Sequence, residues 1–152
     1  MSHNDLQPQL TTVVNYRPDE PDWSLGEEAR HRYIGKNCLY DLAAVKASFQ
    51  LDDVLLVTKD CKHDVTVRLQ SEIADVWAAI QGLTDKQYRN SQWCRTSGKS
   101  WVPCDAYRVI TWPVEVDGAP MSDVYVKFGM SKAGKCLLIV SCHPSGDEYE
   151  DV

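Results

Sequence analysis

The chain has 152 residues, of which 43% are hydrophobic, and a formal net charge of −6. This length suits one compact domain that buries roughly two-thirds of its unfolded surface. No run approaches the ~18 apolar residues that a membrane helix needs, and the N-terminus lacks both a basic start and an apolar signal core. We therefore expect a protein that is soluble, cytoplasmic and not secreted.

The negative charge lies at the two ends of the sequence. Residues 1–29 and 146–152 together hold ten acidic residues and one basic residue, which leaves fifteen basic and twelve acidic residues for 30–145. A mildly basic body can hold RNA phosphates, and acidic ends can lie over the same groove and compete with them. The alternative, that these ends only confer solubility, stays open. We expect a flexible acidic segment over 1–30, an α+β domain over 31–145 and an acidic tail over 146–152.

Six cysteines are scattered through the chain without a Cys-x-x-Cys motif. In a domain large enough to build its own core, this spacing favours reduced thiols over a disulfide framework. The nearest metal-like spacings are Cys61-x-His63 and the adjacent pair Cys142-His143, which are weak zinc signals. We expect no metal and no cofactor.

The N-terminal half of the sequence predicts one helix and one or two strands. The segment before Tyr33 is rich in proline and acid, so it is expected to be a flexible lead-in. Apolar residues recur at helical spacing over 41–49, and Asp41 can cap that helix. The apolar run 54–58 predicts a strand, and 65–69 predicts either a second strand or an irregular turn.

The C-terminal half predicts a long helix and then a set of strands. An apolar stripe over 71–83 indicates the helix, for which Ser71 can supply the cap. The polar stretch that follows indicates a helical turn over 84–91 and then a loop. Strands are expected at 106–116, 123–130 and 136–142, joined by tight turns. The predicted fold class is α+β, with two or three helices followed by an antiparallel β meander.

The last two predicted strands carry the candidate chemistry. Alternation along 123–130 predicts an apolar core side and an opposite side that bears Tyr125 and Lys127. The strand over 136–142 ends beside His143, which can reach the open face or the rim of the sheet. The cations expected nearby are Arg89, Arg95, Lys99 and Arg108.

This set of residues suits cleavage of an RNA backbone. The reaction needs a base for the ribose 2′-hydroxyl proton, an acid for the leaving 5′-oxygen and cations that stabilise the charged phosphorane. Histidine serves either proton role near neutral pH. Aromatic side chains can stack unpaired bases. The open alternative for each is structural: a surface histidine, a solvated sheet face and aromatic anchors in the core. The aromatic candidates are Tyr88, Trp93, Trp101 and Tyr107.

Four stretches occur in the same order and at similar spacing as in a known family: AAIQGLTDKQYRNS, WVPCDAYR, DVYVKF and LLIVSCH. They resemble the MqsR toxins of bacterial toxin-antitoxin pairs. The resemblance covers about Tyr40 to His143 and is strongest from Trp77 onward. It implies a RelE-like fold, ribosome-independent mRNA endonuclease activity and restraint by a cognate antitoxin protein.

Two motifs carry over residue by residue. The family's Val-Tyr-Leu/Val-Lys strand corresponds to residues 124–127, so the resemblance implies that Tyr125 is an active-site tyrosine. The family's Asp-Val-Tyr element corresponds to residues 105–107.

Other positions depart from the family. His143 stands where the family has a catalytic lysine, and Asn90 stands where it has another, with Arg89 as the nearest cation. Cys104 replaces a glutamine. A histidine is chemically competent at position 143, but these changes also fit a divergent copy that has lost cleavage.

The first hypothesis is therefore an mRNA endonuclease that acts by general acid and base chemistry. The second is a non-catalytic protein-interaction module, and a third is an inhibitor whose acidic ends mimic nucleic acid. Under the first hypothesis, the catalytic residues are His143, Tyr125, Arg89 and Lys127, and the RNA-binding residues are Arg108, Arg95, Lys99, Trp101 and Tyr107.

Overall fold

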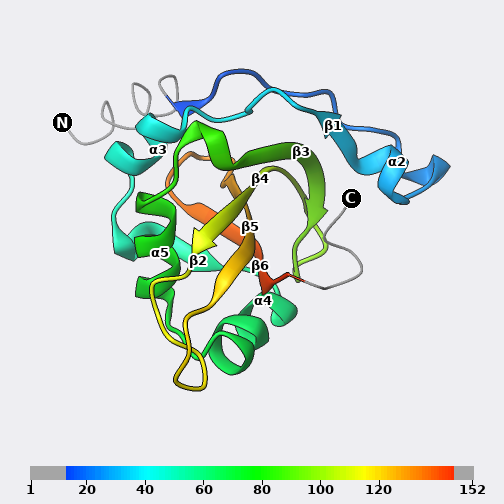
Figure 1. Ribbon diagram of the computed structural model, residues 1–152. Helices are drawn as coiled ribbons and strands as arrows, with labels where there is room; N and C mark the ends of the chain where they lie inside the picture. Colours follow the sequence, from blue (N-terminus) through cyan, green and yellow to red (C-terminus); the bar gives the residue numbers. More distant parts are fainter. Residues whose placement is uncertain (1–12, 146–152) are drawn as a thin grey trace.

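The computed structural model describes residues 13–145, so residues 1–12 and the predicted acidic tail 146–152 lie outside the described residues. One sheet runs through the middle of the molecule, with helices on both sides of it (Figure 1). The elements, with η for short 3-10 or π turns, are η1 Trp23–Leu25, α2 Ala29–Arg32, β1 Tyr33–Gly35, α3 Leu42–Ser48, η2 Leu51–Asp53, β2 Val54–Leu56, α4 Lys59–His63, η3 Asp64–Arg68, α5 Ile73–Gln81, η4 Asp85–Gln87, β3 Tyr88–Arg95, β4 Trp101–Thr111, β5 Ser122–Met130 and β6 Leu137–Pro144.

The strand order overturns the predicted fold class. Within residues 13–145 the order is β1-β3-β4-β5-β6-β2, with β2 parallel to β6 and the other neighbours antiparallel. The expected RelE-like arrangement of two or three helices followed by an antiparallel meander is therefore wrong. The described part is a mixed six-stranded sheet with four short α-helices, and three of those helices separate strands that belong to the same sheet.

Three differences from the expected elements lead to the wrong fold class. Strand β1 was not expected, because three residues are too few for a period-two pattern, and the strand expected at 54–58 is β2, whose parallel partner was not foreseen. Strand β3 lies where the end of a helical turn and a loop were expected, because its polar sequence forms a strand only by pairing along β4. Residues 65–68, for which a second strand or an irregular turn was expected, belong to the π-helical turn η3.

Helices α3 and α5 follow from capping and apolar periodicity. The Asp41 side chain accepts a hydrogen bond from the Ala44 N–H, as expected for a helix cap. Helix α5 begins one residue after Glu72, in a capping box formed with Asp75. Ser71 is not that cap, because its hydroxyl donates to the Leu69 carbonyl and accepts from Trp112 Nε1.

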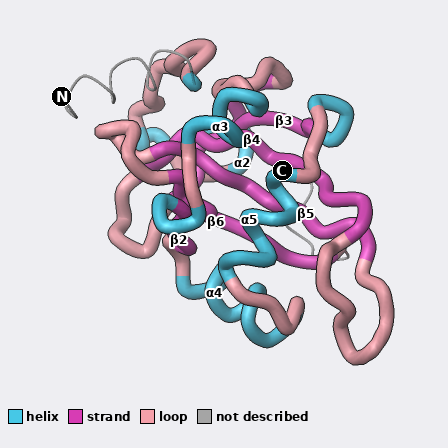
Figure 2. The backbone as a smooth tube through the Cα atoms, turned by 90° about the vertical axis from the view of Figure 1, so that its left-hand side faces the viewer, coloured by secondary structure: helices cyan, strands magenta, loops and turns pink. Residues whose placement is uncertain are grey.

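One side of the sheet, which we call the helix face, packs against α3, α4 and α5. Figure 2 views the molecule from that side and shows these helices in front of the strands. The main core forms here, and the helices fill it with residues at helical spacing. Its fully buried members include Val45, Val65, Val76, Ile80, Val124, Val126, Phe128 and Ile139.

The opposite side, which we call the inner face, curls so that the tip of the β3–β4 hairpin meets the chain just after β2. The Ser97 N–H, at the tip of the β3–β4 hairpin, donates to the Val57 carbonyl at 3.1 Å. The Lys59 N–H in turn donates to Ser97 Oγ at 3.1 Å. A small apolar cluster fills part of the curl, made of Cys94, Val102, Cys104 and Val140 with Val57 and Leu138 against it.

Gly129 permits this curl where β5 passes β4. A Cβ at this position would lie 2.5 Å from Val102 Cγ1 and 2.7 Å from the Pro103 carbonyl oxygen. The second contact is with backbone, which has little freedom to move. Any side chain at position 129 therefore pushes the two strands apart.

The segment before Tyr33 packs against the domain. Val13 is fully buried, and its carbonyl accepts a hydrogen bond from the Asp41 N–H at 2.7 Å. The Trp23 indole stacks on Trp101 with ring centroids 3.9 Å apart. The described domain therefore begins by Val13, which is earlier than the sequence predicts.

Each of the six cysteines, all of which lie within 13–145, is a free thiol. No helix in that range is both long enough and apolar enough to cross a membrane.

Candidate active site

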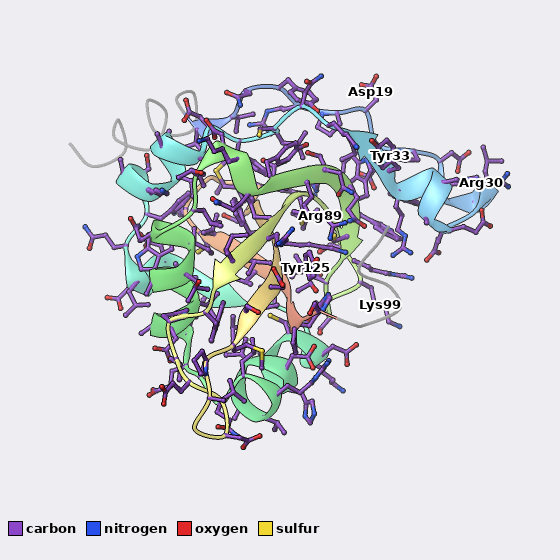
Figure 3. All side chains as sticks on the ribbon, in the orientation of Figure 1. Asp19, Arg30, Tyr33, Arg89, Lys99 and Tyr125 are labelled. Atoms are coloured by element: carbon purple, nitrogen blue, oxygen red, sulfur yellow. The ribbon has the colours of Figure 1, made fainter. Side chains whose placement is uncertain are left out.

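Tyr125 lies at the centre of the candidate site, on the inner face of β5. Strand register places it opposite His143 of β6 and opposite Arg108 of β4. The rings of Tyr125 and His143 have centroids 6.1 Å apart. The guanidinium carbon of Arg89 lies 4.6 Å from the Tyr125 centroid, a cation–π distance (Figure 3). Three of the four predicted catalytic residues are thus in one place.

His143 is buried, not displayed at the rim as the sequence suggested. Only 1% of the surface of this residue is exposed. Its Nδ1 lies 3.0 Å from the Pro144 carbonyl oxygen. Because a carbonyl only accepts, Nδ1 carries a proton in this contact. The imidazole is therefore held in one orientation against Tyr125, and Tyr125 is the more accessible of the two.

Lys127 lies two residues further along β5 and also faces inward. It is 8% exposed, with Ala106 and Ser141 opposite it on the neighbouring strands. Burial is the main reason that the pKa of Lys127 lies below the ordinary lysine value, and the nearby charges of Arg32 and Arg89 act in the same direction. The fourth predicted catalytic residue is thus a buried cation beside the tyrosine.

Arg108 reaches the same region from β4, on the exposed part of that strand. Its Nε donates to Asp123 Oδ1 at 2.7 Å, so part of its charge is neutralised by a neighbour on β5. Arg108 remains a surface cation next to Tyr125 in the strand register.

Three predicted RNA-binding residues lie together at the tip of the β3–β4 hairpin, apart from Tyr125. One face of the Trp101 ring is covered by Trp23. Arg95 lies over the Trp101 ring at 5.5 Å and forms an ion pair with Glu27 at 3.0 Å. Lys99 is exposed in the turn (Figure 3). The stacking surface expected on Trp101 is therefore occupied by the chain's own N-terminal segment.

Tyr107 belongs to the helix face and not to the site. It is 1% exposed, and its ring stacks on Phe128 with centroids 5.5 Å apart. Tyr88 packs edge-on against it. The expectation that Tyr107 binds RNA is wrong, because strand alternation turns its side chain into the main core.

Besides His143, two other positions differ from the resembling family, and their surroundings are different. Cys104 is fully buried in the small apolar cluster of the inner face, so it offers no polar group to a substrate. Asn90 is half-buried and lies beside Arg89 at the start of β3. Arg89 supplies the cation in this part of the site.

A hollow on the inner face, which we call the inner cavity, was not predicted. Its volume is about 610 Å³, and Lys127 is part of its wall. Arg32 is the residue that sequence reasoning missed most clearly, because it lies at the junction between the expected lead-in and the expected domain. Other lining residues are Lys59, Gln92, Arg95, Ser97 and Ser141.

The part of the chain that the structure describes contains no group of three or more His, Cys, Asp or Glu side chains able to hold a metal ion. In comparisons with known proteins, no family model, no curated protein and no solved structure matches the chain.

Proposed function

We propose that this protein is a ribosome-independent endoribonuclease that cleaves single-stranded mRNA, and that it is the toxin of a type II toxin-antitoxin pair. The observation that carries the proposal is the position of Tyr125 between the Arg89 guanidinium and the His143 ring on the inner face. The resemblance of DVYVKF and LLIVSCH to MqsR toxins supports the same function.

The proposed reaction is transfer of the phosphorus from the 5′-oxygen to the neighbouring ribose 2′-oxygen. The 2′-oxygen gives its proton to water and forms a bond to phosphorus, the bond from phosphorus to the 5′-oxygen breaks, and the 5′-oxygen takes up a proton from the Tyr125 hydroxyl, which later regains one from water. Tyr125 touches the scissile phosphate. Arg89 and Lys127 stabilise the additional negative charge of the phosphorane, which is the largest demand of this reaction on the protein.

His143 is assigned to positioning, because its burial keeps it from touching the RNA. Its ring packs beside Tyr125 and is fixed by the contact with the Pro144 carbonyl. The imidazole thus sets the orientation of the phenol.

The test is cleavage of purified mRNA in the absence of ribosomes. Tyr125→Phe keeps the ring and its contact with Arg89 but removes the hydroxyl, so we expect a loss of at least about 100-fold in rate. Tyr33→Phe is the matched control, since Tyr33 is an exposed tyrosine on β1, and its rate should equal that of the wild type. Equal rates for Tyr125→Phe and the wild type would rule out the proposed site.

The role of His143 is tested by separating kcat from KM in the same cleavage. His143→Gln keeps a polar side chain of similar size but removes the ring that packs beside Tyr125. Because His143 is assigned to positioning Tyr125 and not to touching the RNA, we expect kcat to fall while KM stays close to the wild-type value. An unchanged kcat would leave His143 with a packing role only.

A second candidate is a non-catalytic interaction module that keeps the fold. The burial of His143 favours it, because a residue expected to act on RNA is withdrawn from the surface, and so does the apolar Cys104, which stands where the resembling family has a glutamine. This candidate is favoured if the wild-type protein leaves mRNA intact although its cooperative thermal unfolding shows that it is folded.

The proposed cognate antitoxin is a protein that binds this chain and restrains it. Expression of the chain alone should then arrest bacterial growth, and the protein encoded by the adjacent gene should relieve the arrest. Tyr125→Phe should not arrest growth at an equal expression level. Growth arrest that persists in Tyr125→Phe would separate toxicity from the proposed chemistry.

A further inference from the structure

The inner cavity holds buried positive charge that the rest of the protein does not neutralise. Lys127, at 8% exposed, is in none of the salt bridges among the described residues. Two further cations, Arg32 and Arg89, lie close enough to Lys127 to lower its pKa in addition to the effect of burial. A buried charge without a partner is unfavourable, so its retention calls for an explanation from function.

Arg32 brings a second cation into the same cavity. Its Nε is buried and has no hydrogen-bond partner among the described residues. Its position follows from the strand that comes next, because Tyr33 of β1 pairs with Gln92 of β3, and Gln92 lines the cavity. The pairing of β1 with β3 thus fixes Arg32 at the wall of the cavity, whereas Arg30 lies at the outer end of α2 (Figure 3).

The acidic groups around the cavity leave an excess of positive charge. Asp64 pairs with Arg68, and Arg95 is already paired with Glu27. Asp60 is exposed and lies at the rim, near Lys59. Neither the buried Lys127 nor the half-buried Arg32 therefore forms a salt bridge with a carboxylate among residues 13–145.

Neutral donors complete an anion-binding arrangement. Ser97 Oγ accepts from the Lys59 N–H, so its own hydrogen is available to a ligand. Ser141 lies opposite Lys127 in the strand register. The lining contains no aromatic side chain, so the cavity has no platform on which a base can stack.

We propose that the inner cavity binds a phosphate group of the RNA strand, next to the phosphate that lies at Tyr125. This inference rests on the proposed function and adds a second contact point for the same substrate. Lys127 and Tyr125 are two residues apart on one face of β5, which corresponds to about 6.6 Å along the strand. The volume of about 610 Å³ accommodates a phosphate with its ribose. Because phosphate contacts carry no sequence information, this site should hold any RNA sequence equally.

The experiment measures binding separately from cleavage. A fluorescent single-stranded oligodeoxynucleotide lacks the 2′-hydroxyl and stays intact, so its anisotropy reports affinity alone. Arg32→Ala should weaken binding on the order of 10-fold, because one charge-assisted hydrogen-bonding group is lost. The slope of log affinity against log salt should fall by about one, and oligonucleotides of different sequence should be affected alike.

Arg30→Ala is the matched control. It removes the same side chain from the same helix, but Arg30 is exposed and paired with Glu28. Its affinity and salt slope should equal those of the wild type. Lys127→Met is the second variant, and it guards against a folding effect of Arg32→Ala, because removing a buried unpaired cation does not weaken the fold. It should weaken binding as strongly as Arg32→Ala.

Wild-type affinity in both Arg32→Ala and Lys127→Met would overturn the proposal, as would a wild type that does not bind the oligonucleotide. A second arm uses inorganic phosphate in thermal unfolding. In one outcome, phosphate stabilises the wild type but not Arg32→Ala, while both proteins bind the oligonucleotide equally well. That pair of results would assign the cavity to a free anion and overturn the RNA contact. Arg32-dependent binding in a protein that cuts no RNA would support the cavity and reject only the catalytic function.

Discussion

On the helix face the sheet buries Asp105 with three hydrogen bonds, whereas on the inner face it buries Lys127 without a salt bridge among residues 13–145. The Asp105 carboxylate accepts from the Leu39 N–H, the Tyr40 N–H and the Ser91 hydroxyl, at 3.0, 3.1 and 2.6 Å. These bonds oppose the effect of burial, which raises the pKa of Asp105. The first face satisfies its buried charge internally, and the second leaves its charge available to a ligand.

The two faces therefore contribute differently to stability and function. A satisfied buried carboxylate fixes the path of the chain around residues 38–40 and gives no binding capacity. A buried cation without a partner lowers stability and gains favourable interactions only when an anion enters. We expect substitutions on the helix face to destabilise the fold, and removal of the buried cation on the inner face to stabilise it while impairing binding.

The largest expected effect is on the helix face, from Asp105→Asn. An amide has one acceptor oxygen, so at least one of the three donors loses its partner, at a cost of about 2–3 kcal/mol in the free energy of unfolding. Urea denaturation measures this change. Asp52→Asn, at an exposed position, is the control and should stay within about 0.5 kcal/mol of the wild type. Equal effects at the two positions would mean that Asp105 does not organise this face.

A smaller effect is expected from Gly129→Ala, which tests the curl of the inner face. The added methyl meets the Pro103 carbonyl oxygen, so we expect a loss of about 2 kcal/mol by overpacking. Gly98→Ala is the control, because the nearest atom that its methyl meets is a side-chain oxygen at 3.7 Å. If Gly129→Ala unfolds at the same urea concentration as the wild type, the close approach of β4 and β5 is not required.

The smallest effect has the opposite sign. Lys127→Met removes a buried cation and should raise the free energy of unfolding by about 1 kcal/mol at neutral pH. Lys135→Met, at an exposed lysine, should change it by less than about 0.5 kcal/mol. A loss of stability in Lys127→Met would mean that the ammonium is paired in solution, and the contrast between the two faces would fail.

The gain in stability expected for Lys127→Met should depend on pH, and the direction follows from the pKa of Lys127. Burial lowers the pKa of Lys127 in the folded protein below the ordinary value of 10.5, so between the two values the unfolded chain binds the extra proton. The contribution of Lys127 to the stability of the wild type therefore rises with pH across that window. The advantage of Lys127→Met should be full below the lowered pKa and should shrink as pH approaches 10.5. Urea denaturation at several pH values checks this trend.

Elements with strong local signals could be predicted, whereas the pairing of strands distant in the sequence could not. The helices α3 and α5 follow from capping and apolar spacing, and β5 and β6 follow from alternation. Strand β2 belongs to the sheet only because Val54 to Leu56 pair in parallel with residues 137–139. No local pattern in a three-residue strand indicates a partner so far along the chain.

In the candidate site, too, local features could be predicted and features that depend on distant pairing could not. The inward direction of Tyr125 and Lys127 was predictable from one strand alone. The burial of His143 depends on surrounding elements, and the position of Arg32 depends on the pairing of β1 with β3. Tyr107 was expected to bind RNA together with Arg108, but neighbouring residues of a strand point to opposite faces, so Tyr107 lies in the main core beside Val126.

The parallel pairing of β2 with β6 has a consequence for synthesis of the chain. Domains form as units while the ribosome delivers residues in order, and β2 waits more than 80 residues for its partner. Lys127, Ser141 and the wall from Thr58 to Cys61 reach their places only when β6 has emerged. A nascent chain therefore lacks the inner cavity until residues 137–144 of β6 have left the ribosome, although β2 and the helices of the helix face are made earlier.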